Sequence, residues 1–133
     1  MPPGRTPIPL CRSSFLQDLT IELGLRSLKS VRQSYPTLTF RVWNEEVDEE
    51  SYERLDIEAI SVLGWMIKIA IWEDGTAWVY SKKEGSKKSR RPTFETHANL
   101  EGMNARDIAQ LIRDSLTDMD RVENFWKQRT SNS

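Results

Sequence analysis

The feature that most constrains the fold is a pair of alternating runs on either side of an Asp-Gly step. Residues 65–72 are WMIKIAIW, residues 77–81 are AWVYS, and Asp74-Gly75 lies between them. Alternation with a period of two is typical of a half-buried β-strand, and Asp-Gly favours a tight turn between antiparallel strands. The sequence therefore predicts a β-hairpin, and with it a sheet whose two faces differ in chemistry.

The hairpin can close in two registers, which differ in the face that the aromatic side chains occupy. A two-residue turn at Asp74-Gly75 puts the isoleucines on the same face as Trp78, and all of these would be core. A three-residue loop that ends at Gly75 pairs Lys68 with Tyr80 instead. We favour the second register because it gathers the aliphatic residues on one face, and only one face of the sheet needs to meet helices.

In the favoured register one face is aliphatic and the other is mostly aromatic. The aliphatic face would carry Ile67, Ile69, Ile71, Ala77 and Val79. The other would carry Met66, Lys68, Ala70, Trp72, Trp78 and Tyr80. Such a face suits ring stacking, cation–π contacts or a protein partner. The alternative is that another segment, such as the N-terminal arm, covers it as ordinary packing.

Helices are expected at both ends of the domain. Ser14 followed by Gln17 has the spacing of a capping box, and apolar residues at helical spacing carry this helix to Tyr35-Pro36. A strand over residues 19–23 is the rival prediction. The clearest element is a single C-terminal helix, capped by Asn104 and holding an apolar stripe as far as Trp126.

Strands are expected at residues 37–43, 54–59 and 93–100 in addition to the hairpin. Residues 54–63 also fit a helical stripe that would end at Gly64, so a helix is the alternative there. The predicted fold is α+β: a single antiparallel β-sheet of about four to five strands, with an N-terminal and a C-terminal helix packed on one face. We expect a flexible Pro-rich arm at 1–12, one domain at 13–129 and a disordered tail at 130–133.

Charge and cysteine content limit the function classes. The net charge is −1, which argues against a strongly basic nucleic-acid binder. The single cysteine cannot form an internal disulfide, and residues 1–10 lack the apolar core of a secretory signal. No apolar run approaches the ~20 residues needed to cross a bilayer. We therefore expect a cytoplasmic protein that does not associate with membranes.

The charges are segregated into two blocks. The acidic block comprises Glu45, Glu46, Asp48, Glu49, Glu50, Glu53, Asp56 and Glu58, and the basic block comprises Lys82, Lys83, Lys87, Lys88, Arg90 and Arg91. The acidic block lacks the spaced oxygens and the glycine of a calcium loop, so a solvated face or a docking surface is expected. The basic block reads as a solvated loop, or as a phosphate-binding one beside the aromatic face.

Recognisable catalytic chemistry is missing from the sequence. His97 is the only histidine, and there is no nucleophile elbow, phosphate-cradling glycine loop or cysteine cluster. We expect no catalytic residue, metal or cofactor, although His97 would be the first acid/base candidate if the chain were an enzyme. The expected function is a small non-catalytic protein-interaction module of adaptor or regulatory type, and self-association through the aromatic face is one form of it.

The alternative function is nucleic-acid binding by the aromatic hairpin face and the basic block. Trp72, Trp78 and Tyr80 would stack bases. Phosphates would be bound by Lys68, Lys82, Lys83, Lys87, Lys88, Arg90 and Arg91. The same residues are the candidate contacts with a protein partner under the first hypothesis.

Overall fold

A computed structural model describes residues 11–26, 28–62, 64–82 and 94–130. The described elements are α1 (Ser14–Leu25), α2 (Lys29–Ser34), β1 (Thr37–Val47), β2 (Glu50–Ile60), β3 (Met66–Trp72), β4 (Thr76–Lys82), β5 (Phe94–Asn99), α3 (Ala105–Thr117) and α4 (Met119–Gln128). The strands form a single antiparallel sheet in the order β1-β2-β3-β4-β5. The predicted α+β class is confirmed.

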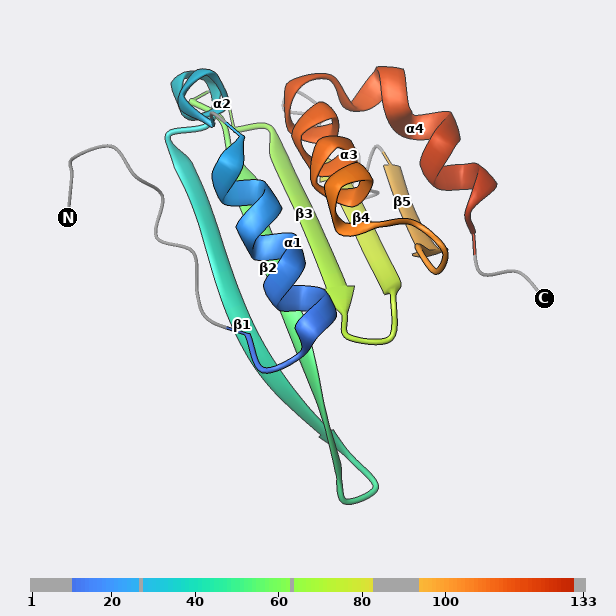
Figure 1. Ribbon diagram of the computed structural model, residues 1–133. Helices are drawn as coiled ribbons and strands as arrows, with labels where there is room; N and C mark the ends of the chain where they lie inside the picture. Colours follow the sequence, from blue (N-terminus) through green and yellow to red (C-terminus); the bar gives the residue numbers. More distant parts are fainter. Residues whose placement is uncertain (1–10, 27, 63, 83–93, 131–133) are drawn as a thin grey trace, which may run out of the picture.

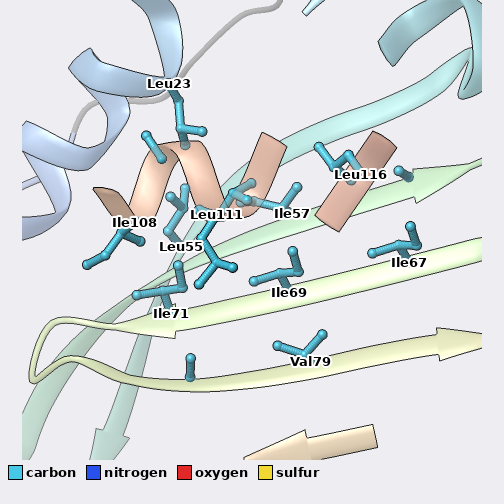
Figure 2. Close-up of a cluster of buried hydrophobic side chains, with 14 of the residues drawn as sticks. Leu23, Leu55, Ile57, Ile67, Ile69, Ile71, Val79, Ile108, Leu111 and Leu116 are labelled. Carbon is cyan, nitrogen blue, oxygen red and sulfur yellow. The ribbon is translucent and has the colours of Figure 1, made fainter. Parts of the chain in front are cut away.

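The helices lie on one side of the sheet, and the core is packed between the two layers (Figure 1). Sheet residues such as Leu55, Ile57 and Ile69 are fully buried, and they face Leu23 of α1 and Ile108 of α3 (Figure 2). These strands alternate buried and half-buried positions, so one residue in two enters the core. The described helices therefore cover one face of the sheet and leave the other face without a helix.

The hairpin adopts the favoured register. Ala70 lies opposite Trp78 and Lys68 lies opposite Tyr80. Gly75 has φ +90°, and its N–H donates to the carbonyl oxygen of Trp72 at 3.0 Å. A positive φ is cheap only for glycine, which explains why the three-residue loop ends at this position. All five residues expected on the aliphatic face are buried.

The β1–β2 hairpin is longer than the sequence predicted. Residues 54–60 are strand, which confirms the first prediction and rules out the helical alternative for them. Both strands continue to a two-residue turn at Asp48 and Glu49, where φ is 51° and 68°. Pairing between β2 and β3 begins only at Arg54, so residues 44–53 extend past the rest of the sheet as a two-stranded arm (Figure 1).

The N-terminal helix differs from its prediction in two ways. Ser13, not Ser14, is the N-cap, since its hydroxyl accepts from the N–H of Leu16. The helix also ends at Leu25 instead of continuing to Tyr35, and α2 is a separate element. At the break the side chain of Arg26 crosses to α3, where it donates to Gln110 Oε1 and to the carbonyl oxygen of Arg106. The rival strand over 19–23 is wrong.

The C-terminal helix is also divided in two. Asn104 caps α3 as predicted, by accepting from the N–H of Asp107 at 2.8 Å. The helix stops at Thr117, and Asp118 caps α4 by accepting from the N–H of Arg121. The turn at Asp118 lets α4 fold back, and it buries Trp126, whose indole N–H donates to Ser115 Oγ at 2.9 Å. The apolar residues keep their helical spacing through Asp118 in the sequence, although the helix itself is interrupted there.

The described ends of the chain are attached to the domain. The N–H of Cys11 donates to Gln17 Oε1, and Thr130 forms a β-bridge with Ala98. The remainder of the expected arm and tail, residues 1–10 and 131–133, lies outside the described residues. Among the helices that the structure describes, none is both long and apolar enough to cross a membrane.

Candidate functional site

The face of the sheet opposite the helices is the candidate site, and we call it the open face. Its side chains form rows across the strands, because directly opposed residues of paired strands share a face. The pairings give one row of Trp43, Arg54 and Trp72, a second of Arg41, Asp56, Ala70, Trp78 and His97, and a third of Thr39, Glu58, Lys68, Tyr80 and Glu95. Three of the five tryptophans of the chain lie in these rows.

The aromatic residues predicted for this face do share it. Trp72, Trp78, Tyr80 and Lys68 are each half-buried, and they lie on neighbouring strands. The rings of Trp78 and Tyr80 are stacked, with their centroids 5.6 Å apart and an angle of 30° between the planes. The predicted grouping is therefore present, and no described helix or strand packs over it (Figure 1).

Carboxylates hold two of the tryptophans in place. The indole N–H of Trp72 donates to Glu45 Oε2 at 2.9 Å, and that of Trp78 donates to Glu95 Oε2 at 3.0 Å. Each bond joins a polar edge of the ring to a charged group at the surface. The rings therefore have fixed orientations before any partner arrives, which lowers the entropy lost on binding.

Arg54 and Trp43 belong to the site although sequence reasoning did not select them. The guanidinium of Arg54 lies over the ring of Trp72 at 5.5 Å and binds Asp56 through two bonds of 2.7 and 3.0 Å. Trp43 lies opposite Arg54 on β1 and is 45% exposed. The alternation of residues 54–59 was visible in the sequence, but the pairing of β1 with β2 was needed to place Arg54 between the two tryptophans.

A hollow of about 260 Å³ lies over Ala70. Ala70 is the smallest residue in the middle of the open face, and larger side chains on three strands surround it. The walls include Trp72, Trp78, Asp56 and Lys68, and Lys68 is itself 3.5 Å from Glu58. Ala70 is only 7% exposed, because the larger side chains around it extend farther from the sheet than its methyl group does. The hollow has room for a side chain of a binding partner.

Charges on the open face are balanced. The cations in its three rows and at the end of β4 are Arg41, Arg54, Lys68 and Lys82, and the carboxylates in the rows are Asp56, Glu58 and Glu95. Glu45, which lies farther along β1 and bonds to Trp72, is a fourth carboxylate. Two of the cations are already paired with carboxylates of the same face. The other basic candidates, Lys83, Lys87, Lys88, Arg90 and Arg91, lie outside the described residues.

One member of the acidic block is structural, which corrects its assignment to a solvated or docking face. Glu53 is buried on the helix side of the sheet, and its carboxylate accepts from the N–H groups of Arg12 and Ser13, each at 2.8 Å. It thereby fixes the start of α1 to β2. Burial, and then the charge of Glu53, raise the pKa of Cys11 to about 11. The other acidic residues on the arm are exposed.

A catalytic or metal-binding arrangement is not evident in the described part of the chain. His97 is exposed on the open face opposite Trp78. The described residues contain no group of three His, Cys, Asp or Glu side chains that could hold a metal ion. Comparison with known proteins found no match: neither a family model, nor a curated protein, nor a solved structure is similar to this chain.

Proposed function

We propose that this protein is a non-catalytic interaction module that binds a partner protein through its open face. The observation that carries the proposal is the concentration of Trp43, Trp72, Trp78 and Tyr80, together with two arginines, on the sheet face that the helices leave bare. Tryptophan, tyrosine and arginine are the residues most enriched at the energetic centres of protein interfaces. Without a partner, large aromatic side chains on a face that no helix covers would leave apolar surface in contact with water, which is unfavourable.

Charge distinguishes the chemistry of the partner. The described residues of the open face include carboxylates as well as cations, and Glu45 and Glu95 are bonded to the rings that would have to stack on bases. A phosphate backbone would be repelled by those carboxylates, whereas a protein surface of mixed charge would not. The balance therefore favours a polypeptide partner over the alternative, a nucleic acid.

The hollow over Ala70 defines what the partner should present. Two of its walls are the indole rings of Trp72 and Trp78, and the charged groups that complete its lining already bind one another. A cation or carboxylate that entered would have to break those pairs, so an apolar or aromatic side chain is the better occupant. We propose that the partner inserts one such side chain here, flanked by charges of both signs.

The test is a selection of peptides from a random phage-displayed library against the full chain. We expect the selected peptides to share an apolar or aromatic anchor and to lose at least about tenfold in affinity for the variant Ala70→Arg, which fills the hollow. Thr37→Arg adds the same charge at the edge of the same face, and it should bind them normally. Circular dichroism and thermal unfolding would check that both variants fold.

Two results would contradict this proposal. One is a set of peptides that bind Ala70→Arg as tightly as the unchanged protein. The other is tight binding of a fluorescent pool of single-stranded RNA or DNA that weakens steeply with salt and survives Ala70→Arg, with no peptide selected. That second outcome would favour nucleic-acid binding through the basic block.

A further inference from the structure

The two edges of the sheet differ in how their backbone groups are satisfied. At the β5 edge, the N–H of Asn99 donates to the carbonyl oxygen of Arg129 at 2.8 Å, and Ala98 forms a bridge with Thr130. The other edge strand, β1, runs over 11 residues without a proline and pairs only with β2 among the described strands. Proteins usually shorten, cover or interrupt a long edge of this kind, because it can pair with another strand.

The outward-facing groups of β1 can be identified from its neighbour. The carbonyl oxygen of Glu53 accepts from the N–H of Glu73, so the backbone of Glu53 points toward β3 and away from β1. In an antiparallel ladder the opposed residue, Asn44, then points its own N–H and C=O outward. By alternation, Phe40, Val42 and Glu46 do the same.

The free part of this edge has a defined length. At one end, the carbonyl oxygen of Leu38 accepts from Arg32 Nη2 at 3.1 Å. At the other end the strand turns at Asp48. Between them, no described residue hydrogen-bonds to the backbone groups that Phe40, Val42, Asn44 and Glu46 point outward. The midpoint of this stretch is Trp43.

We infer that a second copy of this chain pairs with β1, antiparallel and centred on Trp43, to form a two-fold symmetric dimer with one continuous sheet. This register places Val42 opposite Asn44 of the second copy, and Phe40 opposite Glu46 of the second copy. Both members of each pair point their backbone groups outward, so each pair exchanges N–H···O=C bonds in both directions. A two-fold axis repeats every contact, as in most homodimers.

The side chains of β1 are complementary to themselves in this register. Arg41 faces Glu45 of the second copy, and symmetry repeats the pair; all of these side chains are exposed in the single chain. Glu45 uses Oε2 to accept from Trp72, and Oε1 bonds to no described residue. At the centre, Trp43 meets Trp43 of the second copy in a non-hydrogen-bonded pair, where opposed side chains approach most closely.

The two-stranded arm of residues 44–53 would contact the second copy in this dimer. In the same register Asp48 of the second copy lies opposite Leu38, beside the guanidinium of Arg32. The arm, which extends past the sheet of a single chain, would then lie along β1 of the other copy (Figure 1). The inference does not rest on the proposed function. The dimer uses Trp43 and Arg41 at the edge of the open face, whereas Trp72, Trp78 and the hollow over Ala70 lie on inner strands.

Sedimentation equilibrium of the full chain tests the dimer and its register. We expect a species of twice the 15.5 kDa chain mass at micromolar concentration. Val42→Pro removes the backbone N–H that points away from β2 and donates to no described residue, so this variant should be a monomer. Val42→Thr keeps that N–H and should remain a dimer. Arg41→Glu and Glu45→Arg should each weaken the dimer roughly tenfold, and the double variant should restore it.

A monomer at every concentration would overturn the inference. So would a dimer whose affinity neither single charge reversal changes, because the proposed register brings those two charges together. If Val42→Pro fails to fold, the charge-reversal variants still decide the question, since both substituted side chains are exposed.

Discussion

The two faces of the sheet use the same strands for opposite purposes. Ile69 and Lys68 are neighbours on β3, yet Ile69 is fully buried under the helices while Lys68 lies opposite Tyr80 on the open face. The tryptophans divide in the same way. Trp126 is fully buried with its N–H bonded to Ser115, whereas Trp72 and Trp78 bond to surface carboxylates. The residue type alone therefore does not tell whether a tryptophan belongs to the core or to the open face. The hydrogen-bond partner of its indole N–H does.

The largest expected effect separates those two kinds of tryptophan. Trp126→Ala should lower the free energy of unfolding by about 4 kcal/mol, because it leaves a large cavity and removes the indole N–H from which Ser115 Oγ accepts. Trp78→Ala should cost about 1 kcal/mol, since the ring is half-buried and stacks on Tyr80 at the surface. Urea unfolding of the two variants measures both. Equal losses would mean that the open face is as much a part of the core as the covered one.

Two carboxylates on β2 sharpen the comparison at a smaller scale. Glu53→Gln should lower the free energy of unfolding by about 2 kcal/mol. Each carboxylate oxygen of Glu53 accepts from one backbone N–H, whereas an amide has a single acceptor oxygen, and its NH₂ group would face the second N–H. Glu58→Gln on the open face should change stability by less than about 0.5 kcal/mol, since its pair with Lys68 is exposed. The same urea experiment compares them, and a cost at Glu58 as large as that at Glu53 would refute the assignment of the two faces.

The smallest effect concerns Cys11, which lies against Glu53. Its pKa of about 11, raised from 9.0, lowers the thiolate fraction near pH 8.5 by roughly a hundredfold, so alkylation by iodoacetamide should be slow. Because the folded state holds the proton more tightly than the unfolded chain, the contribution to stability is full below about pH 9 and is lost as the pH rises toward 11. Glu53→Gln should speed alkylation, and an unchanged rate would remove the charge of Glu53 as a cause.

Local patterns were sufficient to predict the β3–β4 hairpin and its two faces. The clustering of isoleucines chose the hairpin register, and Gly75 supplied the positive φ that this register requires. The helix breaks could not be seen, because apolar spacing runs through Asp118 and through residues 26–28 without interruption. The breaks depend on contacts with distant residues, such as the bonds from Arg26 to α3, which no local pattern contains.

The candidate site was predictable only in part. Trp72, Trp78, Tyr80 and Lys68 follow from the hairpin alone. Arg54 and Trp43 required the pairing of β1 with β2, and the burial of Glu53 required the packing of the chain before α1 against the sheet. In the sequence Glu53 is one acid among eight in its block, and nothing local marks it as the one that is buried.

If the open face is bare, Trp72 and Trp78 must be accessible to a soluble paramagnetic probe while Trp126 is not. The protein would be labelled with 5-fluorotryptophan, each fluorine resonance assigned by a Trp→Phe substitution, and a soluble gadolinium chelate added. We expect strong broadening of the Trp72 and Trp78 resonances and none of the Trp126 resonance. Resonances of Trp72 and Trp78 that stay as sharp as that of Trp126 would show that the open face is covered, and would contradict its proposed role as a binding surface.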